Sequence, residues 1–337
     1  MKAVGYQKSL AIENPDSLID IELEAPKPTG HDLLVEIEAI SVNPVDTKIR
    51  KRTEPPAGDY KVLGWDAVGQ VTAVGEQVSL FKPGDRVWYA GAIDRPGTNA
   101  QYHLVDERIV GRCPANLSAA QAAAMPLTSI TAWEMLFDRL ALKRNGSNKG
   151  ATLLVIGAAG GVGSILVQLA KALTDAVVIG TAARDKSITW VKRLGAHHVI
   201  DHSNNLSEEI KQVGLDCVSH IAAITRSDLH FDEMVELIKP FGQIAMIDDP
   251  GDIAIGKLKT KSVSFHWELM FTRSLFHTED MIEQHRLLNE VAQMVEQGQI
   301  QTTLSQNFGV INAENLRRAH ALIESGKSRG KIVLEGF

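Results

Sequence analysis

The sequence predicts a mixed α/β protein with two domains, one built on a parallel sheet and one rich in short β-strands. From residue 150 onward, short apolar runs alternate with helix-like segments, the pattern of a parallel sheet covered on both faces. The first third instead consists of short alternating segments separated by Gly and Pro, which predicts a compact, barrel-like β domain. The chain of 337 residues is long enough for both, because single hydrophobic cores rarely exceed about 250–300 residues.

In the β-rich part, polar and apolar residues alternate in segments that we expect to form strands: 32–39, 67–74 and 86–88. Gly or Pro marks the expected turns at 28–30, 75–76 and 83–84. Further along, Ser118 is an N-cap candidate in front of good helix formers at 119–124, and Pro126 then marks a boundary.

In the parallel-sheet part, apolar runs predict strands at 151–156, 176–181, 197–201, 215–223 and 242–247. Helices are expected between them at 162–173, 185–194 and 228–238. Beyond about residue 263 the alternation stops. The remaining segments predict two helices and a final strand, at 279–297, 313–325 and 331–334.

The composition argues against several classes of protein. A net charge of −6 provides no basic surface, so a nucleic-acid binder is not expected. The two cysteines, Cys113 and Cys217, form no CxxC pair, so neither a disulfide framework nor a cysteine zinc site is indicated. The first residues lack the apolar stretch of a signal peptide, which favours a cytoplasmic location.

One uncharged stretch, residues 151–170, is long enough to span a bilayer and carries Gly157 and Gly161 at GxxxG spacing. Four glycines cluster in its middle, however, and the flanking sequence continues as alternating strands and helices. We therefore expect a strand, a turn and a helix here, and no membrane partner.

A glycine-rich run joins the expected strand 151–156 to the expected helix 162–173. Glycines at such a turn let the backbone approach a dinucleotide pyrophosphate, while the helix N-terminus offers unpaired N–H groups and a partial positive charge. The strand–turn–helix context makes the motif much more specific than a lone GxGxxG. We therefore expect a Rossmann-type dinucleotide site at Gly157, Ala158, Ala159, Gly160, Gly161, Val162 and Gly163.

The end of the second strand of this fold distinguishes NAD from NADP, because a carboxylate there binds the ribose 2′-hydroxyl of NAD. Here Ala182 follows the strand without a carboxylate, Arg184 is the first charged residue, and Lys186 is close behind. A guanidinium matches phosphate geometry, so the sequence favours NADPH over NADH. The alternative is that Arg184 and Lys186 form only the solvated first turn of the next helix.

Other segments carry a family resemblance. Together with the glycine run, the sequence Phe-Lys-Pro-Gly-Asp-Arg-Val at 81–87 resembles the medium-chain dehydrogenase/reductase superfamily, over essentially the whole chain. Ser-Val-Asn-Pro-Val-Asp-Thr at 41–47 is similar to its quinone oxidoreductase branch, and residues 63–69 and 264–273 resemble bacterial proteins labelled zinc-type alcohol dehydrogenase-like. The resemblance implies a homodimer and two domains, a GroES-like catalytic domain over 1–125 and 265–337 and a Rossmann domain over 126–264.

The same resemblance bears on a catalytic zinc ion. Zinc-dependent members place a Cys-His pair where this chain has Asn43 and Pro44, and a histidine where it has Trp65. Neither Asn43 nor Trp65 contributes to the N/S tetrahedron that zinc prefers. We therefore expect no metal, and zinc-dependent alcohol oxidation is disfavoured.

A second metal-like pattern is the HxxxH spacing of His198 and His202, with His197 adjacent. No carboxylate accompanies it at the expected strand end, so metal binding is not favoured. The resemblance gives His202 another use, because relatives often carry there a tyrosine that contacts the adenosine 2′-phosphate.

Without a metal, the expected reaction is hydride transfer to an acceptor that is already electron-poor, such as a quinone or an α,β-unsaturated carbonyl. The protein then holds this small electrophile near the nicotinamide and donates a hydrogen bond to the developing enolate oxygen. Asn43 is the first candidate donor, and Thr131 is the second, or a contact to the cofactor. Asp46 is a candidate for orienting the loop or relaying a proton, or simply for capping a turn.

Quinone oxidoreductases usually carry tyrosines just after this loop, whereas this chain has the charged residues Lys48 and 50–52, a pattern typical of a solvated loop. Aromatic residues elsewhere are candidate replacements or ordinary core residues: Tyr60, Trp65, Trp88 and Trp267. The resemblance also implies residues beside the nicotinamide half of the cofactor: Ile224, Ile247 and Lys331.

The sequence thus predicts a zinc-independent, NADPH-dependent oxidoreductase acting on quinones or α,β-unsaturated carbonyls. The alternative is a low-turnover NADPH-binding regulatory or structural protein. The missing tyrosines keep this alternative open, and the absence of a basic patch weakens it.

Overall fold

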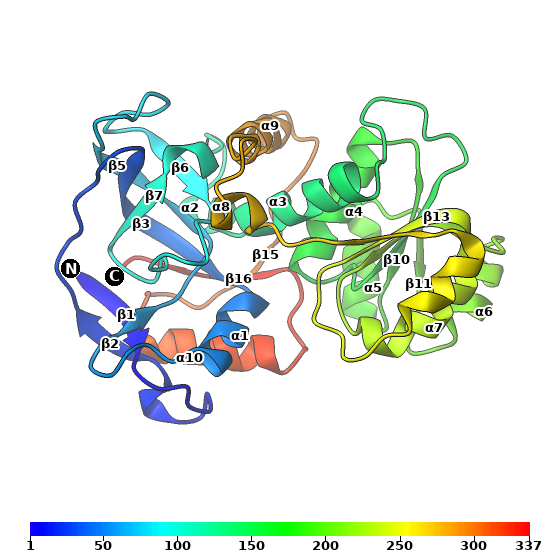
Figure 1. Ribbon diagram of the computed structural model, residues 1–337, viewed down its shortest axis with the longest axis horizontal. Coiled ribbons are helices and arrows are strands. Elements are labelled where there is room, and N and C mark those ends of the chain that lie inside the picture. Colours follow the sequence, from blue (N-terminus) through cyan, green and yellow to red (C-terminus); the bar gives the residue numbers. More distant parts are fainter. The chain divides into compact units, whose positions relative to one another are not determined.

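The computed structural model describes all 337 residues, in two compact units. Unit 1 comprises Met1–Ile130 and Phe271–Phe337, and unit 2 comprises Thr131–Met270 (Figure 1). The domain limits expected from the sequence, 125/126 and 264/265, lie a few residues before these divisions.

The strands of unit 1 form two sheets. A three-stranded antiparallel sheet has the order β2-β1-β4, and a seven-stranded sheet has the order β15-β16-β3-β5-β6-β8 with β7 paired to β3. The strands are β1 (Lys2–Tyr6), β2 (Ile19–Glu22), β3 (Asp32–Val42), β4 (Lys61–Val62), β5 (Ala67–Val74), β6 (Arg86–Tyr89), β7 (Tyr102–Asp106), β8 (Val110–Arg112), β15 (Leu304–Asn307) and β16 (Lys331–Glu335). The predicted β-rich domain is confirmed.

Helices flank these sheets: α1 (Pro44–Arg52), α2 (Ala119–Ala123), α3 (Pro126–Trp133), α8 (Thr272–Leu275), α9 (Glu283–Glu296) and α10 (Ala313–Glu324). Ser118 caps α2 as expected, because its hydroxyl accepts the Gln121 N–H at 3.2 Å and the Gln121 Oε1 accepts the Ser118 N–H at 3.0 Å. Pro126 is the first residue of α3, a favoured position for proline, so the expected boundary is a helix start.

Lys48 and the charged residues 50–52 do not form the solvated loop that the sequence favours. They make up the C-terminal half of α1, where Arg50 is fully buried and its Nη2 pairs with Glu324 of α10. The helix begins there because Asn43 is at the N-cap and Pro44 at the first helical position.

Unit 2 is a six-stranded parallel sheet in the order β11-β10-β9-β12-β13-β14. Its strands are β9 (Thr152–Ile156), β10 (Val177–Thr181), β11 (His198–Ile200), β12 (Val218–Ala223), β13 (Ile238–Met246) and β14 (Ser264–Trp267). Its helices are α4 (Gly161–Leu173), α5 (Asp185–Arg193), α6 (Leu206–Gln212) and α7 (Ser227–Leu237), with a π-helical turn at Glu134–Arg139 and a 3₁₀ segment at Ile255–Lys261. The predicted Rossmann-type sheet is confirmed.

The strand order reverses between β9 and β12, so the loops after these strands flank the switch point where ligands of such sheets bind. The expectation that the alternation stops at residue 263 is wrong, because β14 adds a sixth strand parallel to β13. Ser264 and Trp267 of this edge strand are exposed, so β14 lacks the continuous apolar run of a central strand.

No helix combines the length and the apolar character needed to cross a bilayer.

Candidate functional site

The glycine turn of unit 2 begins where β9 ends. Gly157 has φ +91°, a conformation that favours glycine, and its N–H donates to Thr181 Oγ1 at 3.0 Å. A Cβ on Gly157 would lie 2.8 Å from Thr225 Cγ2. The turn therefore depends on glycine for its backbone angle and for its packing.

The turn leads directly into α4. Gly160 is the N-cap and has no side chain to cap the helix, so the first N–H groups, on Gly161, Val162 and Gly163, remain available to a ligand. A Cβ on Gly163 would lie 2.4 Å from the Gly157 carbonyl oxygen, so only glycine lets the helix pack this closely on the turn. With Ala158 and Ala159, the seven residues expected at the pyrophosphate are contiguous: four form the turn and three form the start of α4.

Cationic and imidazole side chains follow the next strands of the same sheet. Arg184 is the N-cap of α5 and Lys186 is in its first turn, both exposed, directly after the buried Ala182. His202 follows β11, and burial lowers the pKa of its imidazole, with a further lowering from Arg184 and Arg226. Its Nδ1 is buried and makes no hydrogen bond.

Arg226 was not identified from the sequence. It is exposed, adopts a left-handed φ of +52° and precedes α7. Its position soon after β12 was the available signal, since the carboxyl ends of parallel strands meet at one edge of a sheet.

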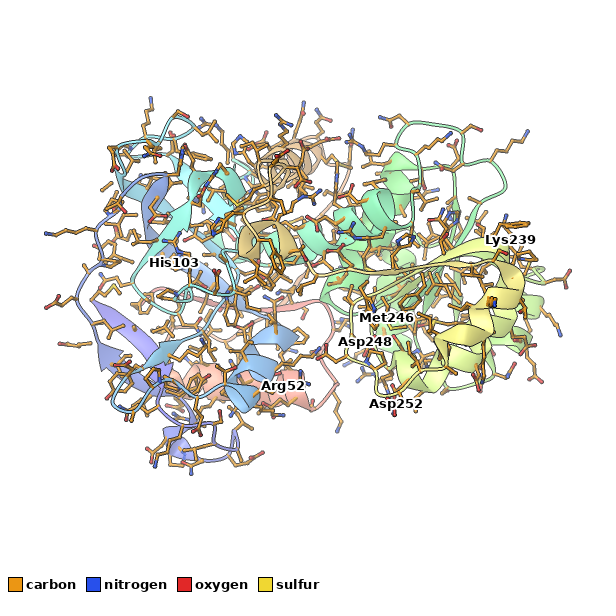
Figure 2. All side chains as sticks on the ribbon, viewed as in Figure 1. Arg52, His103, Lys239, Met246, Asp248 and Asp252 are labelled. Carbon is orange, nitrogen blue, oxygen red and sulfur yellow. The ribbon has the colours of Figure 1, made fainter.

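The loops after β12 and β13 continue the backbone ladder beyond the strands. The Ile224 N–H donates to Ile156 O, and the Ile247 N–H donates to Ala223 O, each at 3.2 Å. Asp248, two residues after Met246 (Figure 2), accepts the Ser227 N–H at 2.9 Å and so caps α7. The α7 N-terminus is therefore occupied by a carboxylate of the chain, whereas that of α4 is not.

Thr131, the second candidate donor or a contact to the cofactor, is buried in α3.

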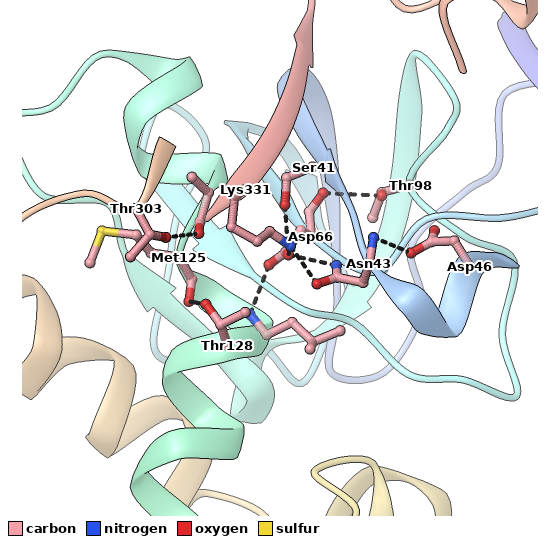
Figure 3. Close-up of polar contacts among 11 residues, drawn as sticks. Ser41, Asn43, Asp46, Asp66, Thr98, Met125, Thr128, Thr303 and Lys331 are labelled. Atoms are coloured by element: carbon pink, nitrogen blue, oxygen red, sulfur yellow. Dashed lines mark hydrogen bonds and ion pairs between the residues drawn. The ribbon is translucent and has the colours of Figure 1, made fainter. Parts of the chain in front are cut away.

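Unit 1 contains a second candidate site, which we call the Asp66 cluster: Ser41, Asn43, Asp66 and Lys331, with the backbone N–H of Leu127 (Figure 3). Asp66 Oδ2 accepts from Ser41 Oγ at 2.8 Å, from Asn43 Nδ2 at 2.8 Å and from Lys331 Nζ at 2.9 Å. Its Oδ1 accepts from the Leu127 N–H at 2.8 Å. The Lys331 ammonium also donates to Asn43 Oδ1. All four side chains are buried.

Distant parts of the chain build this cluster. Asn43 follows β3 and precedes α1, while Lys331 begins β16, whose Ile332 pairs with Val42. Leu127 lies in the first turn of α3, where a backbone N–H has no partner within the helix and a carboxylate is favoured. Lys331, expected beside the cofactor, therefore has its ammonium in a buried ion pair.

Asp46 adjoins the cluster through the backbone. Its carboxylate accepts the Asn43 N–H at 2.8 Å, which is the capping contact that the sequence analysis left as an alternative. Burial raises the pKa of the Asp46 carboxyl from 3.8 to about 7. This group therefore titrates near neutral pH.

The candidate aromatic residues lie in different surroundings. Trp65 is buried, donates from Nε1 to Ala92 O at 3.1 Å and meets Phe271 edge to face. Trp88 is also fully buried. Tyr60 is 42% exposed, and Trp267 is 54% exposed on the edge strand β14.

Comparison with known proteins places this fold in a family. Residues 29–126 match the family described as alcohol dehydrogenase GroES-like domain, and residues 194–334 match the family described as zinc-binding dehydrogenase. A zinc-type alcohol dehydrogenase-like protein of Staphylococcus epidermidis is 40% identical over 338 residues, which cover 99% of each chain.

Similarity to solved structures supports the same family. A putative zinc-dependent alcohol dehydrogenase from Rhizobium etli is 55% identical with a TM-score of 0.96, over 100% of this chain and 98% of the other. Escherichia coli quinone oxidoreductase complexed with NADPH is 26% identical with a TM-score of 0.84, over 99% and 100%. The chain belongs to the medium-chain dehydrogenase/reductase superfamily, in its quinone oxidoreductase-like branch, and is an oxidoreductase.

Several of these names imply zinc, but the donors at the Asp66 cluster do not fit that ion. The Trp65 indole has no lone pair to offer and Asn43 Oδ1 faces an ammonium, while both Asp66 oxygens already accept hydrogen bonds. No group of three or more His, Cys, Asp or Glu side chains is arranged to hold a metal.

Proposed function

We propose that the protein is a zinc-independent, NADPH-dependent oxidoreductase that reduces quinones or α,β-unsaturated carbonyls. The observation that carries this proposal is the open N-terminus of α4 behind the glycine turn, since it offers N–H groups to a pyrophosphate. When bound, NADPH supplies the hydride. The chain's own residues bind the dinucleotide, orient the acceptor and stabilise negative charge on its oxygen.

The preference for NADPH is supported by the charges after β10 and β12. Arg184 and Arg226 both act electrostatically on His202, so two guanidinium groups share one end of the sheet in unit 2. A guanidinium binds phosphate oxygens in a bidentate way, and Lys186 adds a further cation. The solved relative from Escherichia coli is described as an NADPH complex.

The choice of substrate is supported by the chemistry of the Asp66 cluster. It supplies an amide donor, Asn43 Nδ2, in place of a metal that would polarise an alcohol or a simple ketone. A quinone or enone delocalises the incoming charge, so a positioned N–H donor suffices to stabilise the developing oxyanion.

The proposal is tested with purified, chelator-treated protein by following the absorbance of reduced nicotinamide across quinones, enones and simple alcohols. We expect turnover with quinones or enones and none with alcohols. Tight NADPH binding without any turnover would favour the regulatory or structural alternative. Loss of quinone reduction on chelation would contradict zinc independence, and restoration by zinc alone would confirm that contradiction.

We also propose that the protein forms a homodimer through β14. This strand is an open edge of a parallel sheet, and its backbone donors and acceptors on one side have no strand partner. Exposed apolar residues accompany it: Trp267, Leu269 and Phe241.

The two cysteines bear on the location of the protein. The free thiols of Cys113 and Cys217 suit a reducing compartment such as the cytoplasm.

A further inference from the structure

The Asn43 side chain is held between two opposite charges in the interior of unit 1 (Figure 3). Its Oδ1 accepts from the Lys331 ammonium, and its Nδ2 donates to Asp66 Oδ2 at 2.8 Å. Lys331 and Asp66 also pair directly, with 2.9 Å between Nζ and Oδ2. None of the three residues is more than 3% exposed, so water does not compete for these bonds.

The two charges specify which way the amide of Asn43 points. An ammonium carries only donors, and a carboxylate carries only acceptors. The flipped amide would place N–H groups against Lys331 and a carbonyl oxygen against Asp66. Both contacts would be repulsive, and burial would strengthen the repulsion. One of the two orientations open to an asparagine amide is therefore selected.

The charges themselves are fixed in turn. The Asp66 carboxylate accepts from Ser41 Oγ and from the Leu127 N–H, each at 2.8 Å. The Lys331 N–H donates to Thr303 O at 2.9 Å, so the backbone behind the ammonium is anchored as well. Neither charge can move without breaking several buried hydrogen bonds.

We propose that Lys331 and Asp66 are positioning residues that fix the Asn43 amide as a hydrogen-bond donor to the carbonyl oxygen of the substrate. This inference rests on the proposed function, which gives Asn43 the donor role. Asn43 Nδ2 carries two N–H groups, and the structure uses one of them for Asp66, which leaves the second for substrate. Lys331 thus acts through Asn43.

The test replaces both charges at once, Asp66→Asn with Lys331→Met, because either change alone would leave an unpaired charge buried. We expect kcat for a quinone to fall at least about tenfold while the Kd for NADPH is unchanged, since a lost oxyanion donor affects the transition state. An unchanged kcat with a raised Kd would overturn the proposal and make Lys331 a cofactor contact. The matched control is Asp232→Asn with Lys257→Met, an exposed pair 2.6 Å apart, which should alter neither constant.

A double-mutant cycle separates positioning from packing. In an Asn43→Ala background, the paired substitution should lower kcat no further, because its target is already gone. A second, independent loss of the same size would show that the pair acts by another route, and would overturn the proposal.

A measurement without turnover keeps this inference separate from the proposed function. In protein labelled with [¹⁵N]asparagine, one Asn43 side-chain proton should be shifted downfield and exchange slowly, because a carboxylate accepts it. The Asn43→Ala variant assigns the signal, and the paired substitution should abolish both signatures. If the protein with both substitutions does not fold, the wild-type spectrum alone is the test. A rapidly exchanging Asn43 amide in that spectrum would overturn the proposal. With the signatures present and no quinone reduced, the proposed function fails, whereas the positioning of the Asn43 amide by Lys331 and Asp66 stands.

Discussion

The Asp66 carboxylate accepts four hydrogen bonds, and all four of its donors are separated from it by at least 23 residues in the sequence. A buried ion pair of this kind is weak evidence for stability, because removing two charges from water offsets much of their attraction. Its defined effect here is geometric, since it orients Asn43. Sequence patterns alone do not reveal such a group, because its members do not share one element.

At the 2′-phosphate end of the proposed cofactor site, we predict that Arg184→Glu weakens NADPH binding much more than NADH binding. A reversed charge repels the additional phosphate, and a lost charge-assisted bond costs about 1.5–3 kcal/mol, or roughly tenfold to a hundredfold in Kd. Arg226→Glu should act in the same direction. Titration of both cofactors measures the effect.

Lys211→Glu is the control for these charge reversals, because Lys211 is exposed on α6. It should change both dissociation constants equally and little. Equal losses for NADPH and NADH in Arg184→Glu would remove that residue from the 2′-phosphate site.

Asp46 gives a prediction for pH. Burial raises the pKa of its carboxyl from 3.8 to about 7, so the folded protein binds this proton more tightly than the unfolded chain. The free energy of unfolding should therefore fall as pH rises from about 4 to about 7, by about 1.4 kcal/mol per unit of pKa difference. Above pH 7 the whole penalty is present.

Asp46→Asn should flatten this dependence in thermal melts, because a neutral amide oxygen still accepts the Asn43 N–H. Asp59→Asn, at an exposed position, should leave the slope unchanged. The same decline of Tm between pH 4 and 7 in Asp46→Asn would assign the titration to another group.

Among the elements, the turn into α4 was predicted from sequence because the whole motif is contiguous. We predict that Gly163→Ala destabilises the protein by about 1–3 kcal/mol and weakens NADPH binding, because its Cβ would lie 2.4 Å from Gly157 O. Gly256→Ala is the matched control, with nothing within 4 Å of its Cβ. Denaturant melts and cofactor titration check both effects, and equal behaviour of the two variants would contradict the close packing.

Helix α1 shows why some elements escape sequence analysis. Its N-terminal signals, Asn43, Pro44 and Asp46, are present, but the helix is mostly charged and lacks a clear apolar face. It is secured instead by Arg50, whose partner Glu324 is 274 positions away. The strand β14 was missed for a related reason, since an exposed edge strand does not show a continuous apolar run.

The α1–α10 contact can be tested with two residues that share one partner. Arg50→Met should lower the free energy of unfolding by about 3 kcal/mol, because Arg50 is fully buried and pairs with Glu324. Lys51→Met should cost less than about 1 kcal/mol, since the Lys51 side chain is half exposed in its pair with the same carboxylate. Urea denaturation measures both, and similar losses would contradict the distinction.

For the whole molecule, each unit contains one part of the proposed chemistry: unit 2 the dinucleotide turn and unit 1 the Asp66 cluster. The sequence predicted the strand, turn and helix of the first part. It located the second only through Asn43 and Lys331, because the remaining contacts depend on how β3, β16 and α3 pack.

The proposed dimer is tested at the edge strand. Trp267→Lys should shift the protein from dimer to monomer in sedimentation velocity, because a charge replaces an aromatic side chain that is 54% exposed. Leu229→Lys, at a residue 57% exposed on α7, should leave the mass unchanged. A Trp267→Lys protein that remains dimeric would place the interface elsewhere.

The ion pair between Asp66 and Lys331 also limits how this scaffold can be re-engineered or diversify. Introducing cysteine at position 43 and histidine at position 65 would still leave the Lys331 ammonium directed at the side chain of residue 43. Replacing Lys331 first would leave the Asp66 charge buried without its partner, at a cost of about 3–5 kcal/mol. That is a large share of the stability of an ordinary domain. A route toward a metalloenzyme that replaces Lys331 first therefore passes through a destabilised intermediate, which simultaneous replacement of both charges would avoid.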